Sequence, residues 1–149
     1  MEGVAQVYGT CGAFAAIKAD GSVVTWGHAH QGGDSSAVAP LLADGVVQVC
    51  GTEGAFAGIK ANGRVVTWGN AEYGGDSSAV APLLTEGVVQ VCGTAGAFAA
   101  IKANGRVVTW GNAEFGGILQ RLLLFSRRAL SKSLDLSVLS RPSKRTAVL

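Results

Sequence analysis

A segment of 42 residues occurs three times in this chain of 149 residues, and no other feature of the sequence restricts the fold as strongly. The three Trp residues lie 42 positions apart, and so do the glycines that open the copies, Gly3, Gly45 and Gly87. The copies cover residues 3–44, 45–86 and 87–117, and the third is truncated. A fixed period of this length is typical of solenoids and propellers, in which each unit buries its apolar face against the next.

Each copy has the pattern of short β-strands, because β-branched residues alternate with other residues at a period of two. In the second copy, strands are predicted at 46–50, 55–60 and 64–68, with a weaker fourth strand around 80–84, where Pro82 would be confined to a sheet edge. Asn62 and Gly63 predict a type I′ hairpin turn between the second and third strands. Four antiparallel strands within 42 residues match the size of a propeller blade.

The composition agrees with a globular β-protein and excludes several other classes. Hydrophobic residues make up 48% of the chain and charged residues 15%, which argues against disorder of its bulk. Gly, Lys, Asp or Asn interrupts every apolar run before the roughly 18 residues that a membrane-spanning helix needs, and the first residues lack the pattern of a secretory signal. All 22 glycines fall within residues 1–117, so their excess reflects the turns of the repeats.

The second copy, GVVQVCGTEGAFAGIKANGRVVTWGNAEYGG at residues 45–75, resembles the repeat of the regulator of chromosome condensation family. The shared order is a hydrophobic strand, a strand with Ala and Ile, an Asp-Gly or Asn-Gly turn, and Val-Val-Thr-Trp-Gly, and the resemblance covers residues 3–117. The resemblance implies a β-propeller. We therefore expect an all-β fold of three antiparallel four-stranded propeller-type blades, forming an incomplete propeller, with a possible additional C-terminal helix.

The chain departs from the family pattern in its repeats, and no family site can be carried over. Alanine and phenylalanine stand where the family usually has His-Thr, at 13–14, 55–56 and 97–98, and Gly-Gly-Asp-Ser-Ser replaces Gly-Gln-Leu-Gly in the first two copies. We expect a non-enzymatic repeat module that mediates protein–protein interaction through its blade loops. The alternative is a fragment of the regulatory propeller of an enzyme such as a HECT-type ubiquitin ligase or a small-GTPase guanine nucleotide exchange factor.

No catalytic, cofactor-binding or metal-binding motif is predicted, because each candidate segment has a structural explanation. The Ser pairs at 35–36 and 77–78 follow Gly-Gly-Asp without a periodic His to act as base, so capped turns are predicted there. The segment 51–54 lacks the Lys-Ser/Thr of a phosphate-binding loop. His28 and His30 form a single His-x-His, whereas zinc needs three or four converging ligands.

The cysteines and tryptophans are predicted to be structural. Cys50 and Cys92 occupy equivalent strand positions, and alternation places both on the apolar face. We therefore expect buried free thiols and a reducing compartment, cytoplasmic or nuclear. Cys11 lies in a turn and is the only candidate for an exposed, reactive thiol. The repeated Trp residues are expected to pack between blades rather than to bind a ligand.

The loop after each Trp-Gly is the candidate partner-binding site, because nearly identical copies differ there and loops on a rigid scaffold commonly carry binding specificity. Neutral drift is the competing explanation. Aromatic side chains at this loop, if exposed, would favour binding. The candidate residues are His28, His30 and Gln31 in the first copy, Asn70, Glu72 and Tyr73 in the second, and Asn112, Glu114 and Phe115 in the third. The partner is expected to be a protein, and no nucleic-acid partner is predicted.

The composition changes abruptly after Gly117. Residues 1–117 hold 5 Lys and Arg against 9 Asp and Glu, a balance of −4, whereas residues 118–149 hold 7 against 1, a balance of +6. Residues 118–134 predict a basic amphipathic helix, and residues 118–136 would suit an anionic membrane surface or a partner groove. The alternative is that this basic tail is a translated intron or a frame-shifted end.

Three blades are too few for a closed propeller, since known propellers have about four to eight. The chain would then assemble with other copies to complete the ring, be a fragment of a longer array, or fold as an open stack. The fragment interpretation is preferred.

Overall fold

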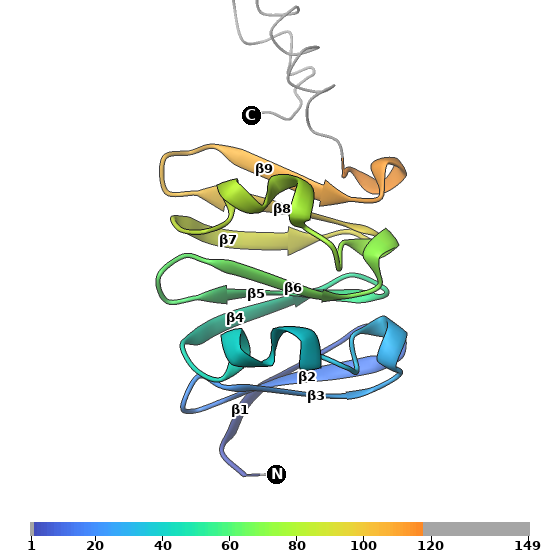
Figure 1. The fold of residues 1–149 in the computed structure, drawn as a ribbon, viewed down its shortest axis with the longest axis vertical. Helices are drawn as coiled ribbons and strands as arrows, with labels where there is room; N and C mark the ends of the chain where they lie inside the picture. The colour runs from blue at the N-terminus through green and yellow to red at the C-terminus, as the bar shows by residue number, and fades with distance from the viewer. Residues whose placement is uncertain (1, 118–149) are drawn as a thin grey trace, which may run out of the picture. The chain divides into compact units, whose positions relative to one another are not determined.

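In this computed structural model, the described residues are 2–117, and they form three separate three-stranded antiparallel sheets (Figure 1). We call the sheets, in chain order, blades 1, 2 and 3. The strands are β1 (Val4–Gly9), β2 (Ala13–Lys18) and β3 (Val23–Gly27) in blade 1; β4 (Val46–Gly51), β5 (Ala55–Lys60) and β6 (Val65–Gly69) in blade 2; and β7 (Val88–Gly93), β8 (Ala97–Lys102) and β9 (Val107–Gly111) in blade 3.

Short 3-10 helices connect the blades and close each blade's last loop. They are η1 (Ala29–Gln31), η2 (Ser36–Leu42), η3 (Ala71–Tyr73), η4 (Ser78–Leu83) and η5 (Ala113–Phe115). Figure 1 shows η1, η3 and η5 above one another along one side of the stacked sheets. Among residues 2–117 no helix is long and apolar enough to cross a membrane. The helix predicted at 118–134 and the contact segment 118–136 lie outside the described residues.

The predicted fourth strand was wrong, because each blade has three strands and the segment around 80–84 belongs largely to η4. Pro82 lies inside this helix, where its fixed φ is tolerated and its missing N–H costs no strand pairing. Val80 and Leu83 are three residues apart, so a 3-10 turn places both on one side, and both pack against the core together with buried Leu84. The segment thus covers the edge of the junction between blades.

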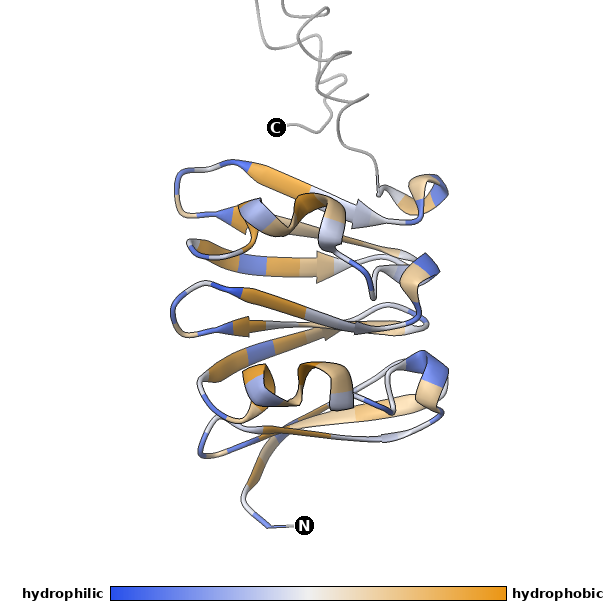
Figure 2. Ribbon diagram, in the orientation of Figure 1, coloured by the Kyte–Doolittle hydropathy of each residue, from blue (hydrophilic) through white to orange (hydrophobic). Residues whose placement is uncertain are grey.

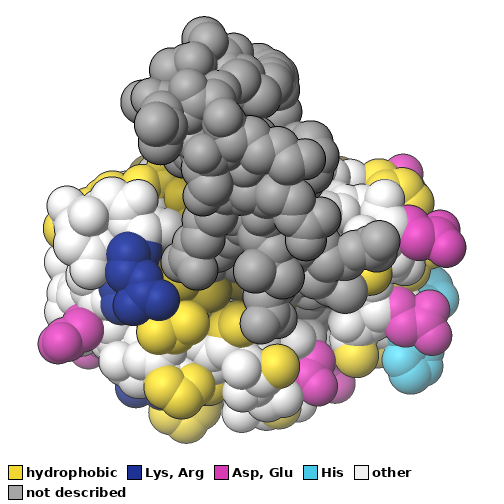
Figure 3. All heavy atoms as spheres, turned by 90° about the horizontal axis from the view of Figure 1, so that it is seen from above, with side chains coloured by type: hydrophobic (Ala, Val, Ile, Leu, Met, Phe, Trp, Pro, Cys, Tyr) yellow, Lys and Arg dark blue, Asp and Glu magenta, His cyan; other side chains and the backbone are white. Residues whose placement is uncertain are grey.

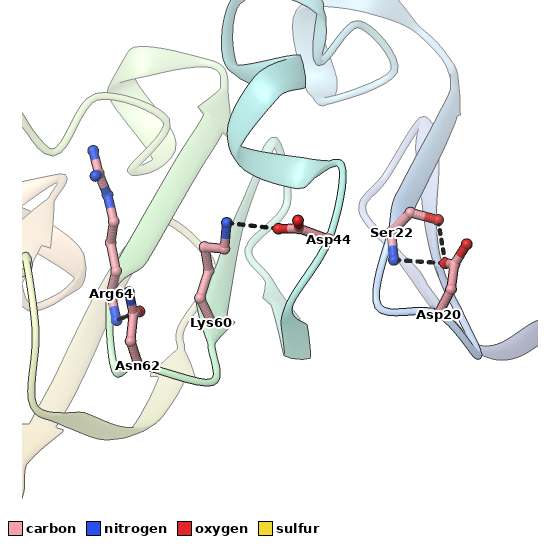
Figure 4. Close-up of polar contacts among 6 residues, drawn as sticks. All are labelled: Asp20, Ser22, Asp44, Lys60, Asn62 and Arg64. Atoms are coloured by element: carbon pink, nitrogen blue, oxygen red, sulfur yellow. Dashed lines mark hydrogen bonds and ion pairs between the residues drawn. The ribbon is translucent and has the colours of Figure 1, made fainter.

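The hairpin turn at Asn62 and Gly63 differs from the predicted type I′ turn. The N–H of Gly63 donates to the carbonyl of Lys60 at 2.8 Å, and the N–H of Lys60 donates to the carbonyl of Arg64 at 2.8 Å. These bonds define a three-residue loop in which Gly63, at φ +84°, takes the left-handed position. The Asn62 side chain accepts from the N–H of Arg64 at 3.0 Å (Figure 4). This bond favours a turn centred on Ala61 and Asn62 instead of the predicted Asn62 and Gly63.

Hydrophobic residues run along the strands of all three sheets (Figure 2), and blade 2 packs between blades 1 and 3 through both of its faces. We call the face toward the preceding blade the front face and the opposite one the back face. A register shift between Val46 and Gln48 lets Val46 and Val49, three residues apart, both lie on the front face of blade 2. On β5, Phe56 packs toward blade 1, whereas the alternate residues Ala55, Ala57 and Ile59 pack toward blade 3.

The predicted burial of both cysteines was wrong. The bulge sets the face on which each cysteine lies, and the blade that packs on that face sets its exposure. The bulge places Cys50 on the back face of blade 2, where it is half-buried against the core that blades 2 and 3 share. Burial raises the pKa of the Cys50 thiol, and the neighbouring Cys92 raises it further. Cys92 lies on the back face of blade 3 and is exposed, as Cys11 is, so Cys11 is not the only exposed thiol. All three cysteines are free.

A Phe–Trp pair holds blade 2 to blade 1 and another holds blade 3 to blade 2, as predicted for the tryptophans. Phe56 and Trp68 have ring centroids 5.4 Å apart, and their side chains are 0% and 4% exposed. The indole N–H of Trp68 donates to the carbonyl of Gly32 in blade 1 at 3.1 Å. Phe98 and Trp110 repeat this arrangement on Gly74 of blade 2, with an indole bond of 3.0 Å. Both junctions are therefore built in the same way.

Candidate functional site

The loop edge of the stack comprises η1, η3 and η5 together with the β1–β2, β4–β5 and β7–β8 turns. Strand pairing brings these segments together, because Ala55 at the start of β5 is paired with Gly69 at the end of β6. The chain therefore leaves each blade beside the turn that joins its first two strands. All nine predicted loop residues lie along this edge, in three equivalent turns.

Every 3-10 turn on this edge begins with the same cap. Asn70 accepts a hydrogen bond through its side chain from the N–H of Glu72 at 2.9 Å, and Asn112 does the same for Glu114 at 2.8 Å. In blade 1 the ring of His28 accepts from the N–H of His30 at 3.3 Å. Gly74, at φ +100°, ends η3 in the left-handed conformation. Through these bonds, the cap residues His28, Asn70 and Asn112 shape the loops.

A threonine, buried in blade 2, fixes the position of each turn relative to its sheet. The hydroxyl of Thr52, whose side chain is 6% exposed, donates to the carbonyl of Tyr73 at 2.8 Å. The same oxygen accepts from the N–H of Ala55 at 3.1 Å. Thr10 and Thr94 make the equivalent bonds to the carbonyls of Gln31 and Phe115. Sequence reasoning missed this residue, although Thr follows Gly at the same place in every copy.

Replacing Thr52 with Val is expected to lower the free energy of unfolding by about 1–3 kcal/mol, because it leaves a buried carbonyl and a buried N–H without partners. Chemical denaturation followed by Trp fluorescence measures the change. Thr94→Val is the matched control, since Thr94 makes the same bonds at an exposed position where water replaces the hydroxyl. Equal losses in the two variants would contradict the role assigned to burial.

The side chains that follow the caps differ in exposure. Tyr73 is half-buried, packs against the core of blades 2 and 3, and lies over Gly54. Gln31 and Phe115 lie over the equivalent glycines of their blades, and Phe115 is 42% exposed. His30, Glu72 and Glu114 are exposed at equivalent positions. These three residues and Phe115 are therefore available to a partner.

An open groove of about 610 Å³ runs between the loops of blades 1 and 2. His30, Asp34 and Ala29 line it from blade 1, and Thr67, Asn70 and Ala71 line it from blade 2. Asp34 begins a turn in which its carboxylate accepts from the N–H of Ser36 at 2.9 Å, as predicted for a capped turn. The Ser36 hydroxyl, and then its N–H, hold the pKa of Asp34 below its ordinary value. The groove thus presents a carboxylate beside small apolar side chains.

The charges of the described blades are divided between two opposite edges. The loop edge and the segments just after it carry exposed carboxylates at Asp34, Glu53, Glu72, Asp76 and Glu114. All five Lys and Arg residues of 1–117 flank the β2–β3, β5–β6 and β8–β9 turns, which we call the hairpin edge. Figure 3 shows dark blue Lys and Arg toward one side of the visible face, with some Asp or Glu near them, whereas the His and most of the visible Asp and Glu lie toward the opposite side.

Acids partly neutralise the hairpin edge. Lys60 lies 3.4 Å from the carboxylate of Asp44, and Asp20 accepts from the N–H of Ser22 at 2.9 Å (Figure 4). The loop edge has no such compensation within the described residues, because none of their Lys or Arg side chains belongs to it. In residues 2–117 no group of three His, Cys, Asp or Glu side chains is placed to hold a metal ion. The His28 and His30 rings lie 5.8 Å apart.

The solved structures that this chain resembles include RCC1-type propellers. Human WBSCR16 matches with a TM-score of 0.54 and 20% identity, over 74% of this chain and 34% of that chain. Prp20p from Saccharomyces cerevisiae matches with a TM-score of 0.52 and 15% identity, over 72% of this chain and 30% of that chain. The described chain folds as a segment of an RCC1-type propeller.

A third RCC1-type structure, yeast RCC1 (Prp20) bound to Kap60, has a TM-score of 0.54 and 16% identity over 72% of this chain and 29% of that chain. The chain thus spans about a third of the length of the RCC1-type propellers it matches. Neither a protein-family model nor a curated protein sequence matches it. The RCC1-type repeat resemblance seen in the sequence is confirmed at the level of the fold.

Proposed function

We propose that this RCC1-type segment is a non-enzymatic protein-interaction module that binds a basic segment of a partner protein along its loop edge. The observation that carries the proposal is the contrast between fixed anchors and variable outward side chains. The threonine bonds and the caps recur in all three blades, whereas the exposed position after the cap is His30, Glu72 or Glu114. A rigid scaffold that varies at its exposed positions is suited to specific recognition.

The charge of the loop edge indicates the chemistry of the partner. Its carboxylates are exposed and lack nearby cations within the described residues, so they attract Lys and Arg side chains and steer their approach. The groove beside Asp34 and His30 accommodates an aliphatic stem that ends in a cation, because Ala29, Ala71 and Val38 line it as well. The structure of the RCC1-type neighbour Prp20p was described together with its binding properties to Gsp1p and histones.

A fluorescent Lys- and Arg-rich peptide, titrated into the full chain and followed by anisotropy, tests the proposal. The double variant Glu72→Gln, Glu114→Gln is expected to weaken binding by about tenfold, since it removes two charge-assisted contacts of the loop edge. Raised salt should weaken the remaining binding of every variant.

The matched control is Asp44→Asn, Glu86→Gln, which makes the same change in net charge at exposed positions of the hairpin edge. It should leave the affinity within about twofold, because charges farther away than a Debye length are largely screened. Both double variants keep residues 118–149 unchanged, so any competition between this basic tail and the peptide affects the two variants equally. Equal weakening in both would show attraction by net charge alone and would overturn the proposed site.

A further inference from the structure

Blade 1 carries the front face of a junction that has no covering blade within residues 2–117. Phe14 and Trp26 form the same stacked pair as in the other blades, with ring centroids 5.5 Å apart. Their side chains are 49% and 38% exposed, against 0% and 4% for Phe56 and Trp68. Val7 is likewise 52% exposed, whereas its equivalent Val49 is 2% exposed. This face therefore presents the complete apolar set that seats a blade on its neighbour.

Blade 3 carries the matching socket. Gly116 has φ +104°, close to Gly74 at +100°. Among the described residues, a Cβ built on Gly116 meets nothing within 4 Å, whereas one on Gly74 meets the ring of Phe98 at 2.5 Å. A hollow of about 200 Å³ lies beside Gly116 and is lined by Cys92, Ala97, Ala99 and Phe115. Ile101 is 40% exposed there, while its equivalent Ile59 is 4% exposed.

We propose that the front face of blade 1 from a second copy of this chain docks on the back face of blade 3, so that the copies associate head to tail. Phe14 of the second copy would lie on Gly116, as Phe56 lies on Gly32 and Phe98 on Gly74. Its Trp26 indole N–H would donate to the carbonyl of Gly116, as the other two indoles do to theirs.

Backbone groups that join the existing blades are also available at both ends. The N–H of Val46 donates to the carbonyl of Gly21 at 2.9 Å, and the N–H of Val88 to that of Gly63 at 3.0 Å. The equivalent pair across two copies is the N–H of Val4 and the carbonyl of Gly105, and a Cβ on Gly105 meets nothing within 4 Å in the described part of the chain. The new junction thus repeats an interface that the chain already builds twice.

A second copy is the occupant we infer because its front face has the residue types that fill both existing sockets. The contact is expected to be weaker than the internal junctions and reversible. Leu42 and Leu84, each 2% exposed, cover the edges of those junctions, whereas position 126, the next in the series, is Ser. A head-to-tail contact of this kind either closes into a ring or extends as an open array.

Sedimentation velocity of the full chain, over about a hundredfold range of concentration, tests the association because a reversible complex grows by mass action. The wild-type chain is expected to form dimers or larger species as concentration rises. Gly116→Ala places a methyl group in the socket and Phe14→Ala empties the front face, so each should weaken association by more than about tenfold. A wild-type chain that stays monomeric at every concentration would overturn the proposal, whatever covers the socket in that monomer.

Mixing the two variants distinguishes head-to-tail from face-to-face association. Phe14→Ala keeps an intact socket and Gly116→Ala keeps an intact front face, so the mixture should form dimers that neither variant forms alone. A Gly116→Ala protein that still dimerises by itself would show pairing of two front faces and contradict the proposal. Val89→Ala is the control, because its equivalent Val47 stays 57% exposed although blade 3 packs on blade 2.

Cysteine reactivity supplies an independent readout that does not depend on size. Cys92 is exposed and lines the socket, so its alkylation rate should fall as the wild-type concentration rises. In Gly116→Ala the rate should be independent of concentration. Circular dichroism of the variants confirms that each is folded, so that loss of association is not loss of structure. A Cys92 rate in the wild-type chain that does not change with concentration would count against a covered socket.

Discussion

Replacing Phe56 with Ala is expected to lower the free energy of unfolding by about 3–5 kcal/mol, the usual cost of removing a fully buried phenylalanine ring. Phe56 is 0% exposed and its ring lies between Trp68 and Gly32, so the cavity falls within the junction of blades 1 and 2. The loss is a large fraction of the stability of a small domain. Denaturation followed by Trp fluorescence measures it.

Phe14→Ala is the matched control for this prediction, because Phe14 is the same residue at the same place in blade 1. Its side chain is 49% exposed, so the loss at low protein concentration should be about 1 kcal/mol, in proportion to the smaller area buried. If the two variants lost the same stability, the fluorescence change would report the strand pairing within a blade rather than the junction between blades.

Gly74→Ala is expected to destabilise the chain by about 1–3 kcal/mol more than Gly116→Ala, because only the first substitution overpacks a filled junction. Both glycines have φ near +100°, so the backbone strain of an alanine is the same at the two positions. At Gly74 the new methyl group would meet the ring of Phe98, which is 1% exposed and stacked on Trp110, and the ring has no room to move.

The two glycine variants are compared by denaturation at low protein concentration, where few copies are associated. Equal losses would mean that positive φ alone accounts for the conservation of glycine among the three repeats. A larger loss for Gly116→Ala would contradict the open socket described for blade 3.

The sequence predicted the features that depend on local periodicity. The strands at 46–51, 55–60 and 65–69 match the predicted ones within a residue, because β-branched runs and turn residues bound them. The position of Trp68 between blades was also predictable, since a large aromatic that repeats with the strands needs a repeating partner. These features are determined within a single repeat.

The features that the sequence did not predict depend on contacts between repeats. The segment 80–84 has a weak alternation of residues that resembles a strand. Its apolar side chains instead cover a junction that only the stacked sheets create. Cys92 has the same sequence surroundings as Cys50, and its exposure differs because no described blade follows blade 3. The bulge after Val46 reverses the face of every later residue of β4, which alternation alone cannot show.

The candidate site was predictable in its location and less so in its details. Differences among the copies identified the loop after each Trp-Gly, yet they did not distinguish the capping side chains of Asn70 and Asn112 from the outward carboxylates of Glu72 and Glu114. The separation of acidic and basic edges also emerged only when the hairpin turns and the loops were placed at opposite ends of the strands.

The most direct measurement of the central claim is an NMR titration of the full chain with the Lys- and Arg-rich peptide, followed through backbone amide shifts. The account predicts that the shifts change along the loop edge, in η1, η3 and η5 and in the residues that line the groove between blades 1 and 2. The amides of the hairpin edge, at 61–64 and 103–106, should change little. Shifts confined to the hairpin edge, or spread evenly over the described blades, would contradict the claim that the loop edge is the binding surface.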